Sequence, residues 1–127
     1  MKLRILDSSI RLRLTQSEVD AVNSDGLVTS TVRFTGGKTF EYVLQSCRIT
    51  RTPQAGMSAN QLVVRVPRST ISSWASSDQV SIRSTQVVDD GGDLKILVEK
   101  DFQCLSPRED EDESDMYPHP ATGEDSC

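Results

Sequence analysis

The alternation of hydrophobic and polar residues is clearest near the start of the chain. Ile10, Leu12 and Leu14 are aliphatic, and the residues between them, Arg11 and Arg13, are basic. Because successive side chains of a strand point to opposite faces, the aliphatic side chains share one face and the two guanidinium groups share the other. The pattern predicts a strand that is buried on one face only.

A helix is expected to begin directly after this strand. Thr15 and Glu18 have the spacing of a capping box, in which each side chain accepts a hydrogen bond from the other residue's backbone amide. Leu14 and Val19 are spaced for a hydrophobic staple across the helix start. Gly26 can adopt the left-handed conformation that ends a helix. The sequence therefore predicts a short helix that shares a core with the sheet.

Further alternating or β-branched segments predict the rest of the sheet. Turn-forming residues at 7–9, 36–37 and 89–93 are expected to join neighbouring strands into three hairpins. Residues 53–60 lack periodicity and are expected to form a loop. The remaining predicted strands cover residues 2–6, 27–35, 39–45, 62–66, 79–88 and 94–102.

A second short helix is expected after residue 67. Ser69 can cap it, and Ile71, Trp74 and Ala75 recur at helical spacing. Its serine-rich sequence has weak helix propensity, so it should form only by packing Trp74 onto the sheet. The elements together predict one α+β domain over residues 1–105: a mostly antiparallel, hairpin-built curled sheet or small barrel with two short helices. No internal repeat at a fixed period is visible.

The net charge of -5 is distributed unevenly along the 127 residues. Residues 1–105 contain 13 Lys and Arg against 11 Asp and Glu, a net charge of +2, whereas residues 106–127 contain Arg108 against 8 acidic residues, a net charge of -7. Repulsion between these acids and the scarcity of apolar side chains predict an acidic tail that is disordered or loosely docked.

Cysteine usage and hydropathy favour a soluble cytoplasmic protein. Cys47, Cys104 and Cys127 are odd in number and widely spaced, which argues against a disulfide framework. The chain contains no long apolar run and no signal-peptide pattern, so no membrane association is expected.

Catalytic and metal chemistry have little support in the sequence. The only histidine, His119, lies between two prolines in the tail, which is a poor platform for a catalytic group. Cys104, His119 and Cys127 are possible zinc ligands, but they lack the short spacings of zinc sites. We therefore predict no catalytic residue, no metal and no cofactor. A small metal-dependent or carboxylate-based enzyme that uses Cys104, His119 and the tail acids is the alternative.

Basic residues on the predicted strands are the other candidate feature. If they shared one face, they could bind an anion or nucleic acid, but aromatic residues are only 5% of the chain and the body carries only +2, which argues against nucleic acid. In a purely structural interpretation, Arg11 and Arg13 pair across strands with Glu99 and Asp101. The arginines concerned are Arg11, Arg13, Arg48, Arg65 and Arg83.

Two segments carry a resemblance to a known family. Residues 9–19 (SIRLRLTQSEV) and residues 92–102 (GDLKILVEKDF), with Cys104-Leu105 after them, resemble a family of small bacterial proteins classed only as a domain of unknown function. Its members are similar in length and in having an acidic tail closed by an aromatic-proline segment, here residues 117–120. The resemblance implies a bacterial cytosolic origin, and it carries over no catalytic or binding residue.

The function favoured by the sequence is a non-enzymatic interaction module with an unknown protein partner. Its acidic tail would be either a ligand for that partner or a shield over the arginine-bearing face. A third interpretation is an anion or nucleic-acid binder regulated by its tail. The candidate binding residues are Arg11, Arg13, Glu99 and Asp101 on the body, and Tyr117 and His119 in the tail.

Overall fold

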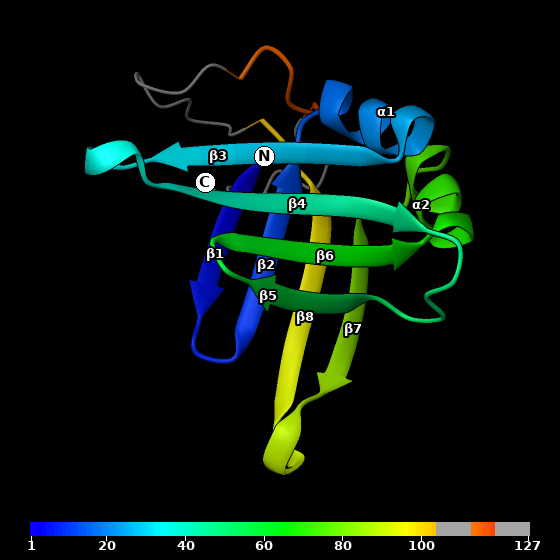
Figure 1. The fold of residues 1–127 in the computed structure, drawn as a ribbon. Helices are drawn as coiled ribbons and strands as arrows, with labels where there is room; N and C mark the ends of the chain where they lie inside the picture. The colour runs from blue at the N-terminus through cyan, green and yellow to red at the C-terminus, as the bar shows by residue number, and fades with distance from the viewer. Residues whose placement is uncertain (104–112, 119–127) are drawn as a thin grey trace.

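Eight strands form two separate four-stranded sheets, and two helices lie together at one corner (Figure 1). The computed structural model describes residues 1–103 and 113–118 of the chain. Sheet A has the order β1 (Lys2–Leu6), β2 (Ser9–Leu14), β8 (Asp93–Lys100), β7 (Ser81–Val87); sheet B has the order β3 (Leu27–Arg33), β4 (Thr39–Cys47), β6 (Gln61–Pro67), β5 (Gln54–Ser58); the helices are α1 (Gln16–Asp25) and α2 (Arg68–Ala75).

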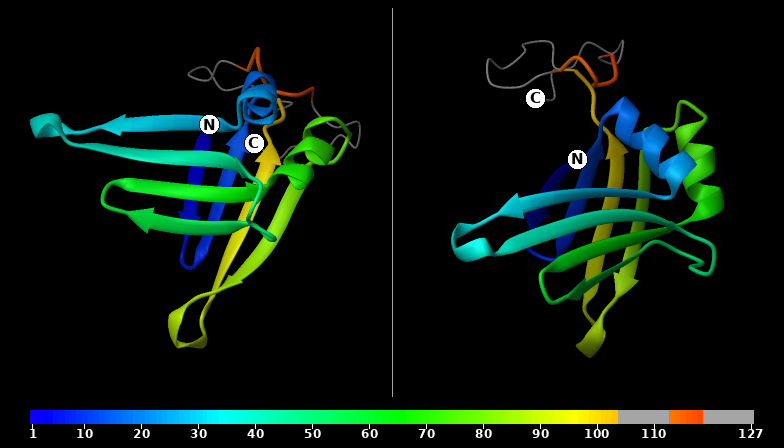
Figure 2. Two further views of the ribbon diagram at one scale, coloured as in Figure 1. Left: turned by 45° about the vertical axis from the view of Figure 1, so that its right-hand side comes forward. Right: turned by 45° about the horizontal axis from the view of Figure 1, so that its top comes forward.

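The hydrophobic core lies between the two sheets and under the two helices. The strands of sheet A cross those of sheet B at a steep angle, and α1 and α2 lie side by side over the corner where β2, β4, β6 and β8 end (Figures 1 and 2). The inward side chains of both sheets and both helices form one cluster, centred on Leu12, Leu44, Val64 and Trp74. The predicted α+β class is confirmed. The barrel alternative and the single curled sheet are wrong, because the strands divide into two sheets that do not close.

The helix start predicted at Thr15 is confirmed. The capping box is present, with the Thr15 amide 2.9 Å from a carboxylate oxygen of Glu18. Leu14 and Val19 are fully buried, as the hydrophobic staple requires. Gly26 ends α1 with φ 82, a left-handed conformation that glycine adopts without a steric penalty. The second helix packs Trp74 into the core as expected.

The prediction of a loop over residues 53–60 is wrong, because this region contains the edge strand β5 and the turn of a fourth hairpin. Its sequence, QAGMS, has no strong alternation, and most of its side chains are exposed. Pairing with β6 holds one side of the strand. On the other side, the Gln86 side chain accepts a hydrogen bond from the Ala55 amide at 2.7 Å and donates one to the Ala55 carbonyl at 3.1 Å.

The two halves of the chain repeat the same topology. The series β1-β2-α1-β3-β4 recurs as β5-β6-α2-β7-β8, and the parallel pairs β2–β8 and β4–β6 each join one half to the other. The register is also repeated: Arg4 pairs with Arg11 as Gly56 pairs with Val63. Asp7 and Ala59, at matching turns, share positive φ angles of 48 and 50.

The repeat does not have one fixed period, which is why the sequence shows no periodic signal. Matched residues are 52 apart from Lys2 and Gln54 onward but 54 apart from Leu27 and Ser81 onward, because the second half has a shorter helix and a longer connection after it. A search for one fixed period misses a repeat whose spacing changes at the helix.

Candidate anion-binding face

The outer face of sheet A carries most of the basic side chains of the sheet. Strand pairing aligns its outward residues in three rows that cross all four strands. We call these residues the basic face, and it contains six basic residues and one acidic residue. The rows are Lys2–Arg13–Glu99–Ser81, Arg4–Arg11–Leu97–Arg83 and Leu6–Ser9–Lys95–Thr85.

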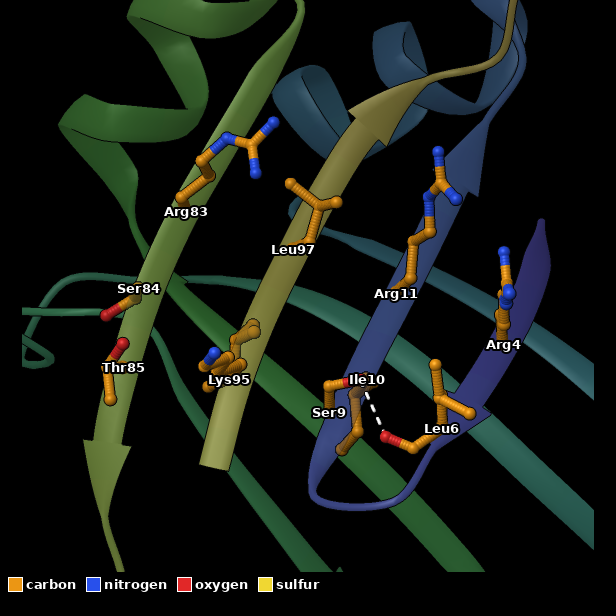
Figure 3. Close-up of a pocket in the computed structure, with 11 residues that line it drawn as sticks. Arg4, Leu6, Ser9, Ile10, Arg11, Arg83, Ser84, Thr85, Lys95 and Leu97 are labelled. Atoms are coloured by element: carbon orange, nitrogen blue, oxygen red, sulfur yellow. Dashed lines mark hydrogen bonds between the residues drawn. The ribbon is translucent and has the colours of Figure 1, made fainter. Parts of the chain in front are cut away.

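The central row brings three guanidinium groups to one side of the sheet. Figure 3 shows Arg4 on β1, Arg11 on β2 and Arg83 on β7, with Leu97 of β8 between the last two. Neighbouring strands lie about 4.8 Å apart, so these side chains stand within reach of a single extended ligand. They line a depression of about 550 Å³, together with Lys95 from the next row.

Glu99 holds two of the arginines in place. It is only 8% exposed, and its Oε1 accepts hydrogen bonds from Arg11 Nε at 2.6 Å and from Arg13 Nε at 2.9 Å. Charge-assisted bonds of this kind are short and directional, so one carboxylate orients two guanidinium groups and leaves a net positive charge. Arg4, Arg83 and Lys95 make no ion pair with any acidic residue in the described ranges 1–103 and 113–118.

The pairing expected of Arg11 and Arg13 is found with Glu99 but not with Asp101. Asp101 is 4% exposed and pairs instead with Lys2, whose Nζ lies 3.0 Å from Asp101 Oδ2. It lies beyond the end of β8, where its backbone bonds to Leu14. The binding roles assigned to Arg11, Arg13, Glu99 and Asp101 from the sequence stay predictions.

Two of the five strand arginines do not belong to the basic face. Arg65 lies on the outer face of sheet B, and Arg48 follows the end of β4. Arg4 and Lys95 also belong to the basic face, and they were not among the residues predicted from the sequence. The turn at residues 7–9 could have identified Arg4, because a hairpin there places it directly opposite Arg11.

The described part of the acidic tail docks beside α1. The Tyr117 amide donates to the Asp101 carbonyl at 2.8 Å, and the Tyr117 ring packs on Phe102 with a centroid separation of 5.6 Å. Met116 is 4% exposed. Burial, helped by the charges of Asp20 and Asp115, raises the pKa of Tyr117 to about 12. The other tail candidate, His119, lies outside the described residues.

Asp115 supplies an anion to the start of α1. Its Oδ1 accepts the Ser17 amide hydrogen bond at 3.2 Å, the Ser17 hydroxyl donates to Oδ2, and the Gln16 amide donates to the Asp115 carbonyl at 2.9 Å. Negative charge is favourable there because the amides at a helix start point outward. The hydrogen bond from the Ser17 side chain lowers the pKa of Asp115 below its ordinary value.

The family model that matches this chain covers residues 1–121 and describes a family of unknown function, DUF7009. The chain belongs to that family. No curated protein and no solved structure matches it. The expected membership of an uncharacterised family is thereby confirmed, while the bacterial and cytosolic origin stays a prediction.

Two further observations concern metal ligands and membrane-spanning helices. The described residues contain no group of three His, Cys, Asp or Glu side chains that could hold a metal ion. Cys104, His119 and Cys127, on which the enzyme alternative depends, lie outside the described ranges. No helix in the part of the chain that the structure describes is long and apolar enough to cross a membrane.

Lys100 is an unusual buried cation near the docked tail. It is 6% exposed, and its Nζ donates to the Ser77 carbonyl at 2.7 Å. The same Nζ lies 5.9 Å from the ring centroid of Trp74 and 5.4 Å from that of Tyr117. Burial lowers the pKa of Lys100, although the charge of Asp78 opposes this shift. These contacts join β8, α2 and the tail, which points to a structural role for Lys100.

Proposed function

We propose that this protein is a non-enzymatic binding module that holds an acidic segment of a partner protein on the basic face. The observation that carries the proposal is the contrast between the central row of sheet A and its matched row in sheet B. Arg4, Arg11 and Arg83 match Gly56, Val63 and Thr29 in the repeated register. The same backbone positions are filled without any charge in sheet B, so the fold does not require these arginines.

The electrostatic cost of the basic face also supports a binding role. Like charges on neighbouring strands repel one another, and only Glu99 offsets the six basic residues within the three rows. An anionic ligand relieves that repulsion. Binding should therefore weaken as salt screens the charges.

The chemistry of the basic face favours carboxylates on a protein segment. Arginine presents a planar fork of donors that matches a carboxylate, and Leu6 and Leu97 offer apolar contacts beside it. Proteins that bind single-stranded nucleic acid stack bases on aromatic side chains, and the three rows of the basic face contain none. The partner recognised best is then an extended Asp- and Glu-rich segment.

The test compares two triple variants by binding of a fluorescent decaglutamate peptide. Arg4→Gln, Arg83→Gln and Lys95→Gln together should weaken binding at least about tenfold, because three charge-assisted contacts are lost. The matched control removes three exposed cations elsewhere: Arg33→Gln, Lys38→Gln and Arg65→Gln. Equal affinity in the two variants would contradict the proposal. Tighter binding of an oligonucleotide of equal charge would favour the nucleic-acid interpretation instead.

A second experiment decides how the acidic tail acts. Changing all four acids of residues 109–112 to Gln or Asn leaves the docked contacts of Asp115 and Tyr117 in place. If the tail shields the basic face, this variant should bind decaglutamate more tightly than the unchanged chain. If the tail is itself a ligand for a partner, the variant and the unchanged chain should bind decaglutamate with the same affinity.

A further inference from the structure

The internal repeat places the start of α2 at the same structural position as the start of α1. Arg68 matches Gln16, and Ser69 matches Ser17. At α1 this turn already holds an anion, since the backbone amide and hydroxyl of Ser17 both bond to the carboxylate of Asp115. The first turn of α1 therefore binds an anionic group, and the first turn of α2 has the same position in the repeat.

The second copy opens into a depression of about 650 Å³, which we call the α2 pocket. Three guanidinium groups line it, and no side chain caps the start of α2, where Pro67 is the N-cap. None of its described lining residues is acidic; Asp25 lies in a neighbouring depression that shares Arg48 and Arg68. The residues lining the α2 pocket are Cys47, Arg48, Thr50, Arg51, Pro67, Arg68, Ser69 and Ser72.

Strand pairing builds the α2 pocket. Cys47 pairs with Pro67 at the end of the parallel β4–β6 ladder, so the chain leaving β4 passes beside the first turn of α2. The Thr50 hydroxyl donates to Cys47 Sγ at 3.1 Å, which ties that chain down between Arg48 and Arg51. Two arginines thus come from the loop and one from the helix.

We propose that the α2 pocket binds a phosphate monoester. A single carboxylate suffices at α1, where the neutral Gln16 and Ser17 meet it. At α2 the position of Gln16 is taken by Arg68, and Arg48 and Arg51 add two more positive charges. A dianionic phosphate suits three guanidinium groups and the outward amides of a helix start better than a carboxylate does. This site shares no residue with the basic face.

Cys47 provides a reporter of occupancy because it is one of the residues that line the pocket. Iodoacetamide alkylation of Cys47, followed by peptide mass spectrometry, should slow at least about fivefold in the presence of millimolar phenyl phosphate. Benzoate, which has a similar ring but a carboxylate, should protect much less. Equal protection by both would overturn the assignment to phosphate, and protection by neither would overturn the site.

Variants separate the pocket from a general charge effect. Arg48→Gln with Arg68→Gln should weaken phenyl phosphate binding at least about tenfold, whereas Arg33→Gln with Lys38→Gln should leave it unchanged. The shift of the Ser69 amide resonance during phosphate titration gives a second readout that does not depend on the thiol. Glycerol 3-phosphate and a phosphoserine peptide then distinguish a small metabolite from a modified protein as the source. Binding that survives in the Arg48–Arg68 variant would refute the proposal.

Discussion

The outer faces of the two sheets share the same strand pairing but differ in charge. In sheet A the central row reads Arg4–Arg11–Leu97–Arg83, and in sheet B the matched row reads Gly56–Val63–Val43–Thr29. Over all three rows, sheet B carries only Arg65 and Glu41 as charged residues, which balance. One scaffold is therefore built twice in the molecule, once with a strongly basic face and once with a neutral one.

The inward faces show the opposite relation, because they are alike in both halves. Leu12 matches Val64, Val28 matches Ile82, and Val22 matches Trp74, all of them buried. Packing fixes the chemistry of the inward positions, so they cannot diverge without loss of stability. The outward positions of the central row differ in charge between the two sheets, and that difference is the basis of the proposed binding role.

The largest expected effect concerns the shared core. Leu12→Ala should lower the free energy of unfolding by about 2–5 kcal/mol, and Val64→Ala, its match in sheet B, should also destabilise, by a smaller amount. Because the parallel pairs β2–β8 and β4–β6 join the two halves, each variant should still unfold in one step. Urea unfolding followed by Trp74 fluorescence and by circular dichroism tests this. Two separated transitions would show that the halves are independent.

Glu99→Gln should have the next largest effect. The change leaves Arg11 and Arg13 partly buried without their carboxylate, at a cost of about 1–3 kcal/mol. The matched residue in sheet B is Gln45, beside Arg65. Gln45→Glu creates only an ion pair with the exposed Arg65 and should change stability by less than about 1 kcal/mol. Urea midpoints compare the two variants, and equal midpoints would show that the two faces do not differ electrostatically.

Asp115→Asn should have a smaller effect on stability. It tests whether the start of α1, unlike the start of α2, is stabilised by a carboxylate of the chain itself. Removing the charge that meets the Ser17 amide should lower the free energy of unfolding slightly, because negative charge is favourable at a helix start. Because hydrogen bonding lowers the pKa of Asp115, its contribution is present above the ordinary carboxyl pKa and is lost as pH falls through the lowered pKa. The difference in stability between the two proteins should therefore shrink on acidification. Ser69→Ala, at the matched position of α2, should leave this pH dependence intact.

The sequence predicts the elements whose signals are local. The alternation of Ile10, Leu12 and Leu14 and the spacing of Thr15 and Glu18 encode β2 and α1 directly, and both are found where expected. β5 has no such signal, because an exposed edge strand needs only its backbone bonds to β6. Local patterns cannot reveal that pairing.

The candidate site could be predicted only in part for the same reason. Arg11 and Arg13 stand out through their alternation, but their neighbours across the sheet depend on which strands pair. The parallel pair β2–β8 joins segments more than 80 residues apart, and this pairing brings Glu99 to Arg13 and Leu97 to Arg11. Nothing in either segment alone specifies it. The α2 pocket could not be predicted either, because Arg48 and Arg51 come close to Arg68 only where the parallel β4–β6 pair ends.

Raising the pH should loosen the tail before it affects either sheet. Burial raises the pKa of Tyr117 to about 12, so its neutral form is favoured in the folded protein. The stability from this burial is fully present below about pH 10, the ordinary tyrosine value, and is lost as pH rises toward 12. Absorbance at 295 nm should show one tyrosine ionising late, and Tyr117→Phe should abolish that phase. If Tyr42→Phe abolishes it instead, the tail does not dock as described.

The smallest expected change in stability comes from exchanging matched residues between the two faces. Arg83→Thr gives sheet A the residue that sheet B has at Thr29, and Thr29→Arg does the reverse. Both positions are exposed, and Arg83 makes no ion pair among the described residues, so each change should alter the free energy of unfolding by less than about 0.5 kcal/mol. Decaglutamate binding should nevertheless weaken in Arg83→Thr. Adding Thr29→Arg should not restore it, because the new arginine has no Arg4 and Arg11 beside it. If Arg83→Thr instead unfolds the protein, the arginine is part of the scaffold, and the contrast between the two faces no longer argues for binding.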